Sequence, residues 1–484
     1  MSLTHWETPS PRWLIILFAI LAIVIGALVG MAVGISPSVY LLFAVTLFLV
    51  IVLLTIANLE FGLLVFIVLT YLRVSDIAVH NYGAPSVARI FIAILVGAIF
   101  LRWAVTGHLP KGWLKPAVLV LAYALVIFGS ILYASDIASA EASASDYWKD
   151  GLITILIVAL IQKKSTFRYV IWALILAGIF VASISVYQYN TGTFDNNYWG
   201  FAEAPLLNIV GVTEGNRVAG PIGDPNFYAQ ILVVLVPLCI NRMISEKRTL
   251  LRIIAGLGAL VITLAVLYTY SRGGIIALVF ALIALALYRP PRLPMVGIFV
   301  AIVAVALLLM PDAFLDRMGT LTNVLSGEQD TRSEVSIRGR TSEMLSAWDM
   351  FIDHPILGVG ADNYPVNYQT YARKLGLDNR ATLREPHNLF LEVAAETGLL
   401  GLLIFGYILF YIFQCIHRAR LGFAQLGDPQ FLDLIGAFSA GLIGYLTAAM
   451  FIHGAYPRYF WLLAGIAMAL PQVLQTQKEA LIKE

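Results

Sequence analysis

Long apolar segments separated by short polar ones recur along the whole chain. Each segment is long enough, or nearly so, to cross a hydrocarbon core of about 30 Å as a helix. The pattern predicts an all-α polytopic integral membrane protein of about 14 (12–14) transmembrane helices. We expect these helices at residues 13–34, 38–56, 59–73, 89–106, 116–134, 150–162, 168–188, 226–243, 250–270, 273–288, 295–311, 388–414, 431–452 and 457–474. Only Asn58 and Glu60 separate the second helix from the third, and merging these two helices would invert part of the predicted topology.

The composition agrees with membrane insertion. Of 484 residues, 60% are hydrophobic and 12% charged, and the mean hydropathy is +0.84. A soluble domain is only about half apolar. The net charge of +2 carries no footprint of nucleic-acid binding, so we expect membrane lipid and no nucleic acid as a partner. The segment after Arg12 resembles a signal sequence, but it is long enough to span and lacks a small-x-small cleavage site, which predicts a retained first helix.

The distribution of positive charge predicts the orientation. With a cytoplasmic N-terminus, about 17 Lys and Arg residues fall on the inside and about 6 in short outside loops, as the positive-inside rule requires. The acidic segment 135–150 then lies outside, and both termini face the cytoplasm. Cys239 and Cys415 fall near cytoplasmic helix ends, so no structural disulfide is expected.

Two outside segments, 189–225 and 312–387, are too long to be simple turns. They divide the chain into helices 1–11 with the first loop (1–311), a large extracytoplasmic loop (312–387), and helices 12–14 with a cytoplasmic tail (388–484). Apolar residues at helical spacing before Pro355 predict an amphipathic helix on the membrane surface, ended by the Gly358–Gly360 turn. A second helix is expected between Tyr364 and Leu375.

The arginines in the predicted outside loops depart from the positive-inside pattern, so each of them calls for an explanation. Arg272 occupies a tight Ser271-Arg272-Gly273 turn, where glycine permits close backbone approach. Arg217 and Arg458 lie in other outside loops, and Arg338 and Arg340 flank Gly339. One interpretation is that these guanidiniums converge on a phosphate or diphosphate. The alternative is that they contact lipid headgroups or pair with loop carboxylates.

A histidine and two glutamates follow the large loop. His387 stands at the start of a helix that carries Glu392 and Glu396 one turn apart. Its ordinary pKa near 6.5 suits a general base for a sugar hydroxyl. A histidine at a helix start is also a common polar interfacial residue, and the glutamates could bind sugar hydroxyls or only cap the helix end.

Several kinds of site are missing. We find no DxD-like acidic cluster, His or Cys metal-ligand spacing, P-loop or GxSxG elbow, so we expect no metal and no cofactor. The middle thirds of the predicted spans contain almost no ionisable residue, which disfavours an ion-coupled transporter.

The order of these features resembles a known family. The residues that carry the resemblance are Arg217-Val218-Ala219-Gly220-Pro221 with Asp224-Pro225-Asn226, then Ser271-Arg272-Gly273, then Trp348, Pro355, Gly358 and Gly360, then His387-Asn388, Leu391, Glu396, Gly398 and Gly401. Over roughly residues 215–401 they are similar to the O-antigen ligase and polymerase superfamily of bacterial polysaccharide assembly.

The resemblance implies transfer of a saccharide from a polyprenyl (undecaprenyl) diphosphate-linked oligosaccharide to a hydroxyl of a glycan or glycolipid acceptor. The reaction would take place at the outer face of the bacterial cytoplasmic (inner) membrane, together with other polysaccharide-assembly proteins. It further implies that Arg272 and Arg217 hold the diphosphate and that His387 activates the acceptor. Arg338, Arg340, Glu396 and Arg458 are expected to assist substrate binding.

Two other classes of function remain open at this point. The number of helices also suits a transporter or flippase of a lipid-linked or amphipathic glycan, and a scaffold of an export complex would need neither His387 nor Arg272. Polymerase and ligase use the same donor and differ in the acceptor, so the sequence does not separate them.

Overall fold

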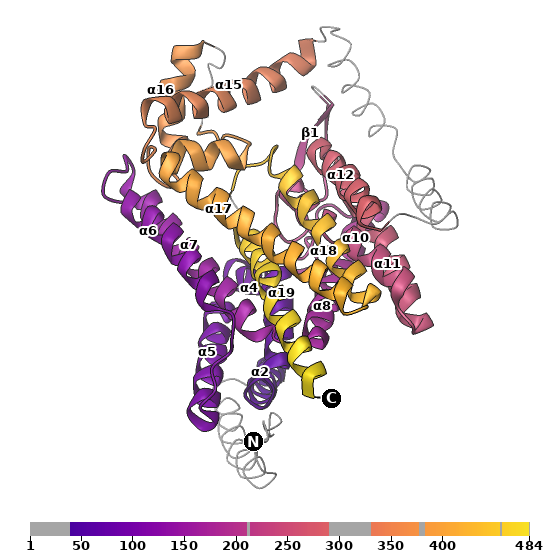
Figure 1. Cartoon of the computed structure of the whole chain (residues 1–484). Helices are drawn as coiled ribbons and strands as arrows, with labels where there is room; N and C mark the ends of the chain where they lie inside the picture. The colour runs from indigo at the N-terminus through magenta and orange to yellow at the C-terminus, as the bar shows by residue number, and fades with distance from the viewer. Residues whose placement is uncertain (1–38, 211–212, 290–330, 377–382, 455–456, 484) are drawn as a thin grey trace.

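The structure, a computed structural model, describes residues 39–210, 213–289, 331–376, 383–454 and 457–483. Its helices are α2 (Val39–Ala57), α3 (Leu59–Tyr71), α4 (Val74–Tyr82), α5 (Val87–Thr106), α6 (Leu114–Ser130), α7 (Ile137–Leu160), α8 (Lys164–Thr191), α9 (Pro225–Val233), α10 (Leu235–Ser245), α11 (Thr249–Tyr268), α12 (Arg272–Tyr288), α15 (Thr331–Asp353), α16 (Tyr364–Leu375), α17 (Leu389–Gln425), α18 (Pro429–Ala448) and α19 (Pro457–Lys483). Most of them form an elongated bundle, with α15 and α16 across one end (Figure 1).

The described residues confirm an all-α membrane protein but not fourteen spans. Seven helices in them are long and apolar enough to cross a membrane, or eight if the bent pair α3 and α4 counts as one. Residues 46–57, 114–130 and 272–288 form shorter apolar helices. The predicted spans 13–34 and 295–311 lie outside the described residues.

The break between the second and third predicted segments has a local cause. The side chain of Asn58 accepts hydrogen bonds from the backbone N–H groups of Glu60 and Phe61, and so caps α3. At its other end α3 bends by 52° into α4, with Arg73 at a left-handed φ of 54°. Helix α4 was not predicted because its sequence mixes polar and apolar residues.

The predicted outside loop 189–225 contains regular structure. A 3₁₀ turn, η1 (Tyr198–Gly200), precedes an antiparallel hairpin of β1 (Leu206–Val210) and β2 (Thr213–Asn216). The hairpin leads directly to Arg217. The sequence analysis missed it because two strands this short carry too few residues for an alternating pattern.

Small residues bring α9, α12 and α18 close together. A Cβ on Gly274 of α12 would lie 2.6 Å from the Cβ of Ala229 in α9, and one on Gly444 of α18 would lie 2.8 Å from that of Ala281 in α12. Close backbone approach of this kind is the usual packing of membrane helices. It places the N-termini of α9 and α12 beside the C-terminal end of α18.

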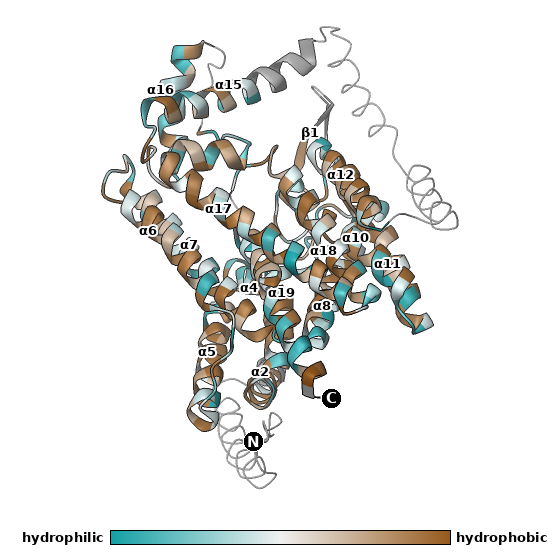
Figure 2. Ribbon diagram, in the orientation of Figure 1, coloured by the Kyte–Doolittle hydropathy of each residue, from teal (hydrophilic) through white to brown (hydrophobic). Residues whose placement is uncertain are grey.

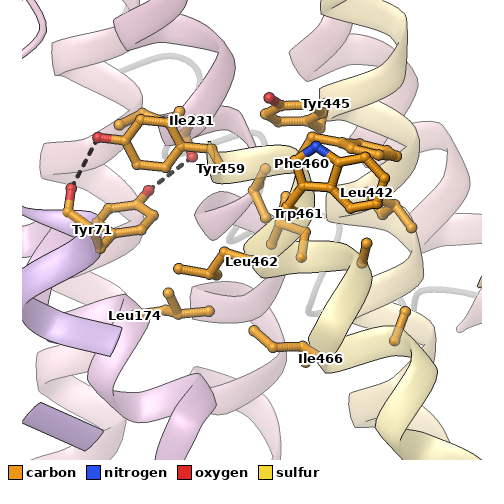
Figure 3. Close-up of a cluster of buried hydrophobic side chains, with 14 of the residues drawn as sticks. Tyr71, Leu174, Ile231, Leu442, Tyr445, Tyr459, Phe460, Trp461, Leu462 and Ile466 are labelled. Atoms are coloured by element: carbon orange, nitrogen blue, oxygen red, sulfur yellow. Dashed lines mark hydrogen bonds between the residues drawn. The ribbon is translucent and has the colours of Figure 1, made fainter. Parts of the chain in front are cut away.

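Buried tyrosines connect the helices of the core. The Tyr71 hydroxyl of α3 donates to the carbonyl of Ile231 in α9 at 2.9 Å, and the Tyr459 hydroxyl of α19 donates to the carbonyl of Tyr71 at 3.1 Å (Figure 3). Apolar side chains such as Leu174 and Leu462 surround them (Figure 3). The core thus fixes α3, α9 and α19 relative to one another.

Hydrophilic residues mark both ends of the bundle (Figure 2). Hydrophobic colour dominates the spans, while hydrophilic residues gather on α15 and α16 and at the opposite end near the C-terminus (Figure 2). That opposite end holds Lys164, paired with Asp428, and Arg289, whose Nε lies 3.3 Å from Asp433. Lys164 and Arg289, which the predicted topology assigns to the cytoplasm, therefore lie at the end of the bundle away from α15 (Figure 1).

Candidate functional site

Arg272 begins helix α12. The preceding turn passes through Tyr270, at a φ of 52°, and buried Ser271, whose hydroxyl accepts a hydrogen bond from the Gly274 N–H and caps the helix. A Cβ on Gly273 would lie 3.0 Å from that of Phe451, so the turn packs directly against the segment after α18. This is the tight turn that the sequence predicted, and it leaves the Arg272 side chain half-buried.

Arg217 is fixed beside this turn. Its Nε donates to the carbonyl of Thr269 at 2.8 Å and its Nη2 to Oδ1 of Asn226 at 3.3 Å, and the residue is only 5% exposed. Burial lowers its pKa to about 10; Asp224 opposes that shift, and the charges of Arg340 and Arg272 add to it. Arg217 therefore stays charged at neutral pH, and these three arginines lie close enough to repel one another.

The large loop contributes further arginines to the same place. Arg340 is an exposed residue of α15, and Arg384 places its Nη1 3.8 Å from Oε1 of buried Glu343, also on α15. Arg338 belongs to α15 as well, but its side chain lies outside the described residues. We refer to Arg217, Arg272, Arg340 and Arg384 as the arginine cluster.

His387 lies against this cluster. It has a φ of 45° and stands just before Asn388, which caps α17 by accepting from the N–H groups of Phe390 and Leu391. Asn388 also donates to the carbonyl of Met450 at 3.2 Å, which fixes the start of α17 to the segment after α18. These contacts fix the backbone from which the His387 side chain extends.

Burial is the main cause that lowers the pKa of His387 to about 3; His453, Arg340 and Arg384 contribute to this shift, and the charge of Asp224 opposes it. Its Nε2 lies 3.7 Å from Oε2 of Glu343, near enough for an ion pair by distance. Because the imidazole is neutral near pH 7, we regard this as a polar contact and not as a salt bridge. A neutral imidazole is the form that can accept a proton.

A second histidine stands beside the first. The rings of His387 and His453 are 5.5 Å apart between centroids, and Phe227 packs edge-on against His453 at 5.1 Å. Burial lowers the pKa of His453 to about 4. Its Nδ1 is buried and finds no hydrogen-bond partner among the residues that the structure describes.

The Glu396 side chain accepts hydrogen bonds from backbone N–H groups. Its carboxylate accepts from the N–H of Asp362 at 2.8 Å and from the N–H of Tyr364 at 3.1 Å, at the start of α16. Next to it, Gly398 interrupts α17 with φ 61° and ψ −162°. These contacts give Glu396 a clear structural task, to hold the loop before α16 against α17.

Arg458 lies away from the arginine cluster. Its Nη1 is 2.7 Å from Oδ2 of Asp76, and its Nε is 3.7 Å from Oδ1 of Asp150, which is only 3% exposed. It therefore links the start of α19 to α4 and α7. This arrangement matches the alternative given for the outside arginines, a pair with carboxylates, and we do not assign Arg458 to an anion site.

The arrangement suits an anion. The helices α9, α12 and α17 all begin here, and helix N-termini attract negative charge through their free N–H groups and dipoles. Among the described residues, Asp224 and Glu343 are carboxylates that lie near these arginines. Within the described part of the chain, no group of three or more His, Cys, Asp or Glu side chains is placed to hold a metal ion.

Sequence reasoning missed Arg384, Glu343 and His453. Arg384 lies three residues before His387, and His453 lies in a short turn between apolar helices on the same side of the membrane as Arg272 in the predicted topology. The position of His453 was therefore a usable signal. No sequence signal marked Glu343, because a single acidic residue in a charged loop is not distinctive.

Residues 257–406 match the family model described as O-antigen ligase. The match confirms the resemblance to the O-antigen ligase superfamily. The O-antigen ligase region runs from α11 to the first half of α17 and includes Arg272, Arg340, Arg384 and His387, whereas Arg217 and His453 lie outside it. No curated protein matches the chain.

Proposed function

We propose that this chain is a glycosyltransferase that moves a saccharide from a polyprenyl diphosphate donor to an acceptor hydroxyl at the outer face of the cytoplasmic membrane. One observation carries the proposal. A neutral imidazole lies beside a cluster of arginines at the convergence of three helix N-termini, and His387 belongs to the region that matches the O-antigen ligase family.

The chemistry needs little more than this. A sugar diphosphate has a good leaving group, so the reaction requires a base, charge stabilisation of the departing diphosphate and correct positioning. His387 accepts the acceptor's hydroxyl proton while that oxygen bonds to the anomeric carbon and the bond from this carbon to the diphosphate breaks. Arg272 and Arg217, with Arg340 and Arg384, stabilise the negative charge of the leaving diphosphate. The proposal includes no metal or cofactor, since the guanidiniums supply the positive charge.

The low pKa of His387 fits a base that becomes effective only with donor bound. A base works best with a pKa near the working pH, and a value of about 3 is far below it. A diphosphate among the arginines would offset the positive charge of Arg340 and Arg384 and so raise the pKa of His387. His387 would then be an effective base when donor is bound and a poor base when the site is empty.

The experiment that tests this proposal is a transfer assay with the purified protein in nanodiscs. Labelled polyprenyl diphosphate oligosaccharide is supplied as donor, and products are separated by size. We expect His387→Ala to lower the transfer rate by about 10²–10⁴ and Arg272→Ala by about 10²–10³. His108→Ala and Arg252→Ala, exposed residues at the other end of the bundle, serve as matched controls.

The products decide between classes of function. A ladder of products that both variants lose indicates a polymerase, and a single addition to a distinct lipid acceptor indicates a ligase. Full activity in folded His387→Ala and Arg272→Ala proteins would contradict the mechanism. Donor that binds and crosses sealed proteoliposomes without any new covalent bond would identify a flippase instead.

A further inference from the structure

A cavity of about 250 Å³ lies next to His453 and is not part of the arginine cluster. Residues from α6, α7, α9, α17, α18 and α19 line it, together with the segments that precede α16 and α17. Its volume lies just below the range of about 300–1,000 Å³ typical of small-molecule sites. It is too small for a polyprenyl chain and suits one small ring.

One wall of the cavity is aromatic. Tyr147 packs edge-on against both Tyr123, at 5.3 Å between ring centroids, and Trp461, at 5.2 Å. All three residues are at least 94% buried and line the cavity. The face of an aromatic ring is negative, so it attracts the weakly positive C–H groups that a pyranose presents on its flat side.

Another part of the lining consists of hydrogen-bond acceptors. Glu385, Glu392 and Asp362 line the cavity, and Gln230 donates its amide to the carbonyl of Tyr445 at 3.2 Å, which leaves its Oε1 as an acceptor. Carboxylate oxygens are the strong acceptors that sugar hydroxyls require as partners. No Lys or Arg side chain of the described residues lines the cavity, so it offers no cation to a phosphate or an acidic sugar. The cavity and the arginine cluster therefore favour opposite kinds of group.

The cavity adjoins the proposed base. His453 lines it, and its ring is 5.5 Å from that of His387. Phe227, which packs on His453, is also a lining residue. A ring held in the cavity therefore lies one side chain away from His387, and the buried, unpartnered Nδ1 of His453 is available to one of its hydroxyls.

We infer that this cavity is the acceptor subsite and that it holds one uncharged sugar ring so that a hydroxyl of that ring reaches His387. The inference rests on the proposed glycosyl transfer. It adds a substrate class, a neutral pyranose at the accepting end of the glycan, and a selectivity, exclusion of uronic acids. The diphosphate stays with the arginines, and the sugar that receives the new bond enters from the carboxylate side.

Helix α7 offers a matched pair of variants to test the cavity. Ser143 lines it, whereas Ser145 is exposed, does not line it and lies on the other side of the helix. Ser143→Trp fills the cavity without removing a carboxylate. Ser145→Trp makes the same change in size on the same helix. Glu385→Gln removes one ionisable group and keeps the shape.

The test uses saturation-transfer NMR on the full chain in nanodiscs. The probes are the methyl glycosides of glucose, galactose, mannose, rhamnose and N-acetylglucosamine, with methyl glucuronide for comparison. We expect a signal from at least one neutral glycoside and none from the glucuronide. Ser143→Trp is expected to lower that signal, and to raise the acceptor KM in the transfer assay, by about tenfold or more. Ser145→Trp leaves both unchanged, and Glu385→Gln lets the glucuronide bind.

Failure of this inference is distinguishable from failure of the proposed function. If the wild-type chain transfers saccharide and Ser143→Trp changes neither the glycoside signal nor the acceptor KM, the cavity is not the acceptor subsite. A glucuronide signal as strong as that of every neutral glycoside would also overturn it. If a neutral glycoside binds and Ser143→Trp prevents this while no transfer occurs, glycosyl transfer is wrong and only sugar binding survives.

Discussion

Arginines of the same predicted side of the membrane have different tasks, and their neighbours decide which. Arg217 hydrogen-bonds a backbone carbonyl and an amide and lies within reach of the charges of Arg272 and Arg340. Arg458 is instead surrounded by Asp76 and Asp150. A guanidinium among other cations can bind an added anion, whereas one already paired with carboxylates stabilises the fold.

This contrast predicts opposite effects of two equal substitutions. Arg458→Gln leaves Asp150, which is 3% exposed, without its cation. We expect a loss of roughly 1–3 kcal/mol in stability, less than for a fully buried pair because the Arg458 side chain is 31% exposed. The donor KM should stay unchanged. Arg272→Gln should raise the donor KM or lower kcat and leave the melting temperature near that of the wild type. Thermal unfolding and transfer kinetics on the same two preparations check this, and equal effects on both quantities would contradict it.

The buried histidines predict how stability depends on pH. The pKa of His453 is about 4 in the folded protein, below its ordinary value of 6.5, so the unfolded chain binds more protons between these values. Stability therefore falls as the pH drops from 6.5 towards 4, by about 2 kcal/mol from this residue at pH 5. His453→Gln should reduce the difference in melting temperature between pH 7.5 and pH 5.

Glu385 provides the control of opposite sign. Burial raises its pKa to about 7, with Asp362 and Glu343 adding to the shift, so the folded chain binds the extra proton. Its contribution to stability is present below pH 4.5 and is lost as the pH rises through 7. Glu385→Gln should therefore increase the melting temperature at pH 7.5 relative to pH 5. The same shift in both variants would refute the assignment.

At the residue scale, the sequence indicated some residues of the candidate site and not others. Arg272 and His387 stood out because each occupies a special backbone position, a tight turn or a helix start, next to an apolar helix. Glu343 and the cavity could not be found in this way. The cavity is assembled from several helices, and no short stretch of sequence records which of their side chains meet.

Among the elements, the crossing of the large loop over α17 is the most constrained. A Cβ on Gly358 would lie 2.3 Å from the carbonyl carbon of Glu396, and one on Gly398 would lie 2.4 Å from that of Ile356. The N–H of Val359 donates to the carbonyl of Ala395 at 2.9 Å across the same crossing. Two backbones therefore touch directly, which places α16 and the end of the loop over the site.

Gly398→Ala should disrupt this crossing. The φ of 61° and ψ of −162° belong to a region that almost only glycine adopts, and strain there costs about 1–3 kcal/mol before any clash is counted. Gly406→Ala, in the same helix, meets nothing within 4 Å and should be neutral or slightly stabilising. Melting temperatures of the two variants test this. A Gly398→Ala protein as stable and active as Gly406→Ala would show that the crossing is dispensable.

The elements themselves were largely predictable, because apolar periodicity and capping residues are local. Helix α16 coincides with its predicted range, and α15 ends before Pro355 as expected. The exceptions have physical reasons. Helix α7 begins at Ile137, within a segment predicted as an acidic outside loop, because Asp136 caps it by accepting from the N–H groups of Ala138 and Ser139. The short strands β1 and β2, and helix α4 with its mixture of polar and apolar residues, have too weak a periodic pattern to be predicted from sequence.

On the scale of the whole molecule, basic side chains lie at both ends of the bundle. The arginine cluster includes Arg340 of α15 and lies at that end of the bundle, while Lys164, Arg289 and Lys247 lie at helix ends on the other side. A donor with a membrane-embedded polyprenyl tail would present its diphosphate at one of the two interfaces, and the proposed function requires that this is the outer one. The positive-inside rule favours the same orientation.

Single cysteines can test this orientation directly. Asp195, before the hairpin, and Lys247, between α10 and α11, are both exposed and lie towards opposite ends of the bundle. The native cysteines are buried, so the parent chain should react little with a membrane-impermeant maleimide. In intact cells we expect Asp195→Cys to react and Lys247→Cys to react only after the membrane is opened. The reverse result would place the arginine cluster in the cytoplasm, where a donor whose diphosphate faces outward could not reach His387.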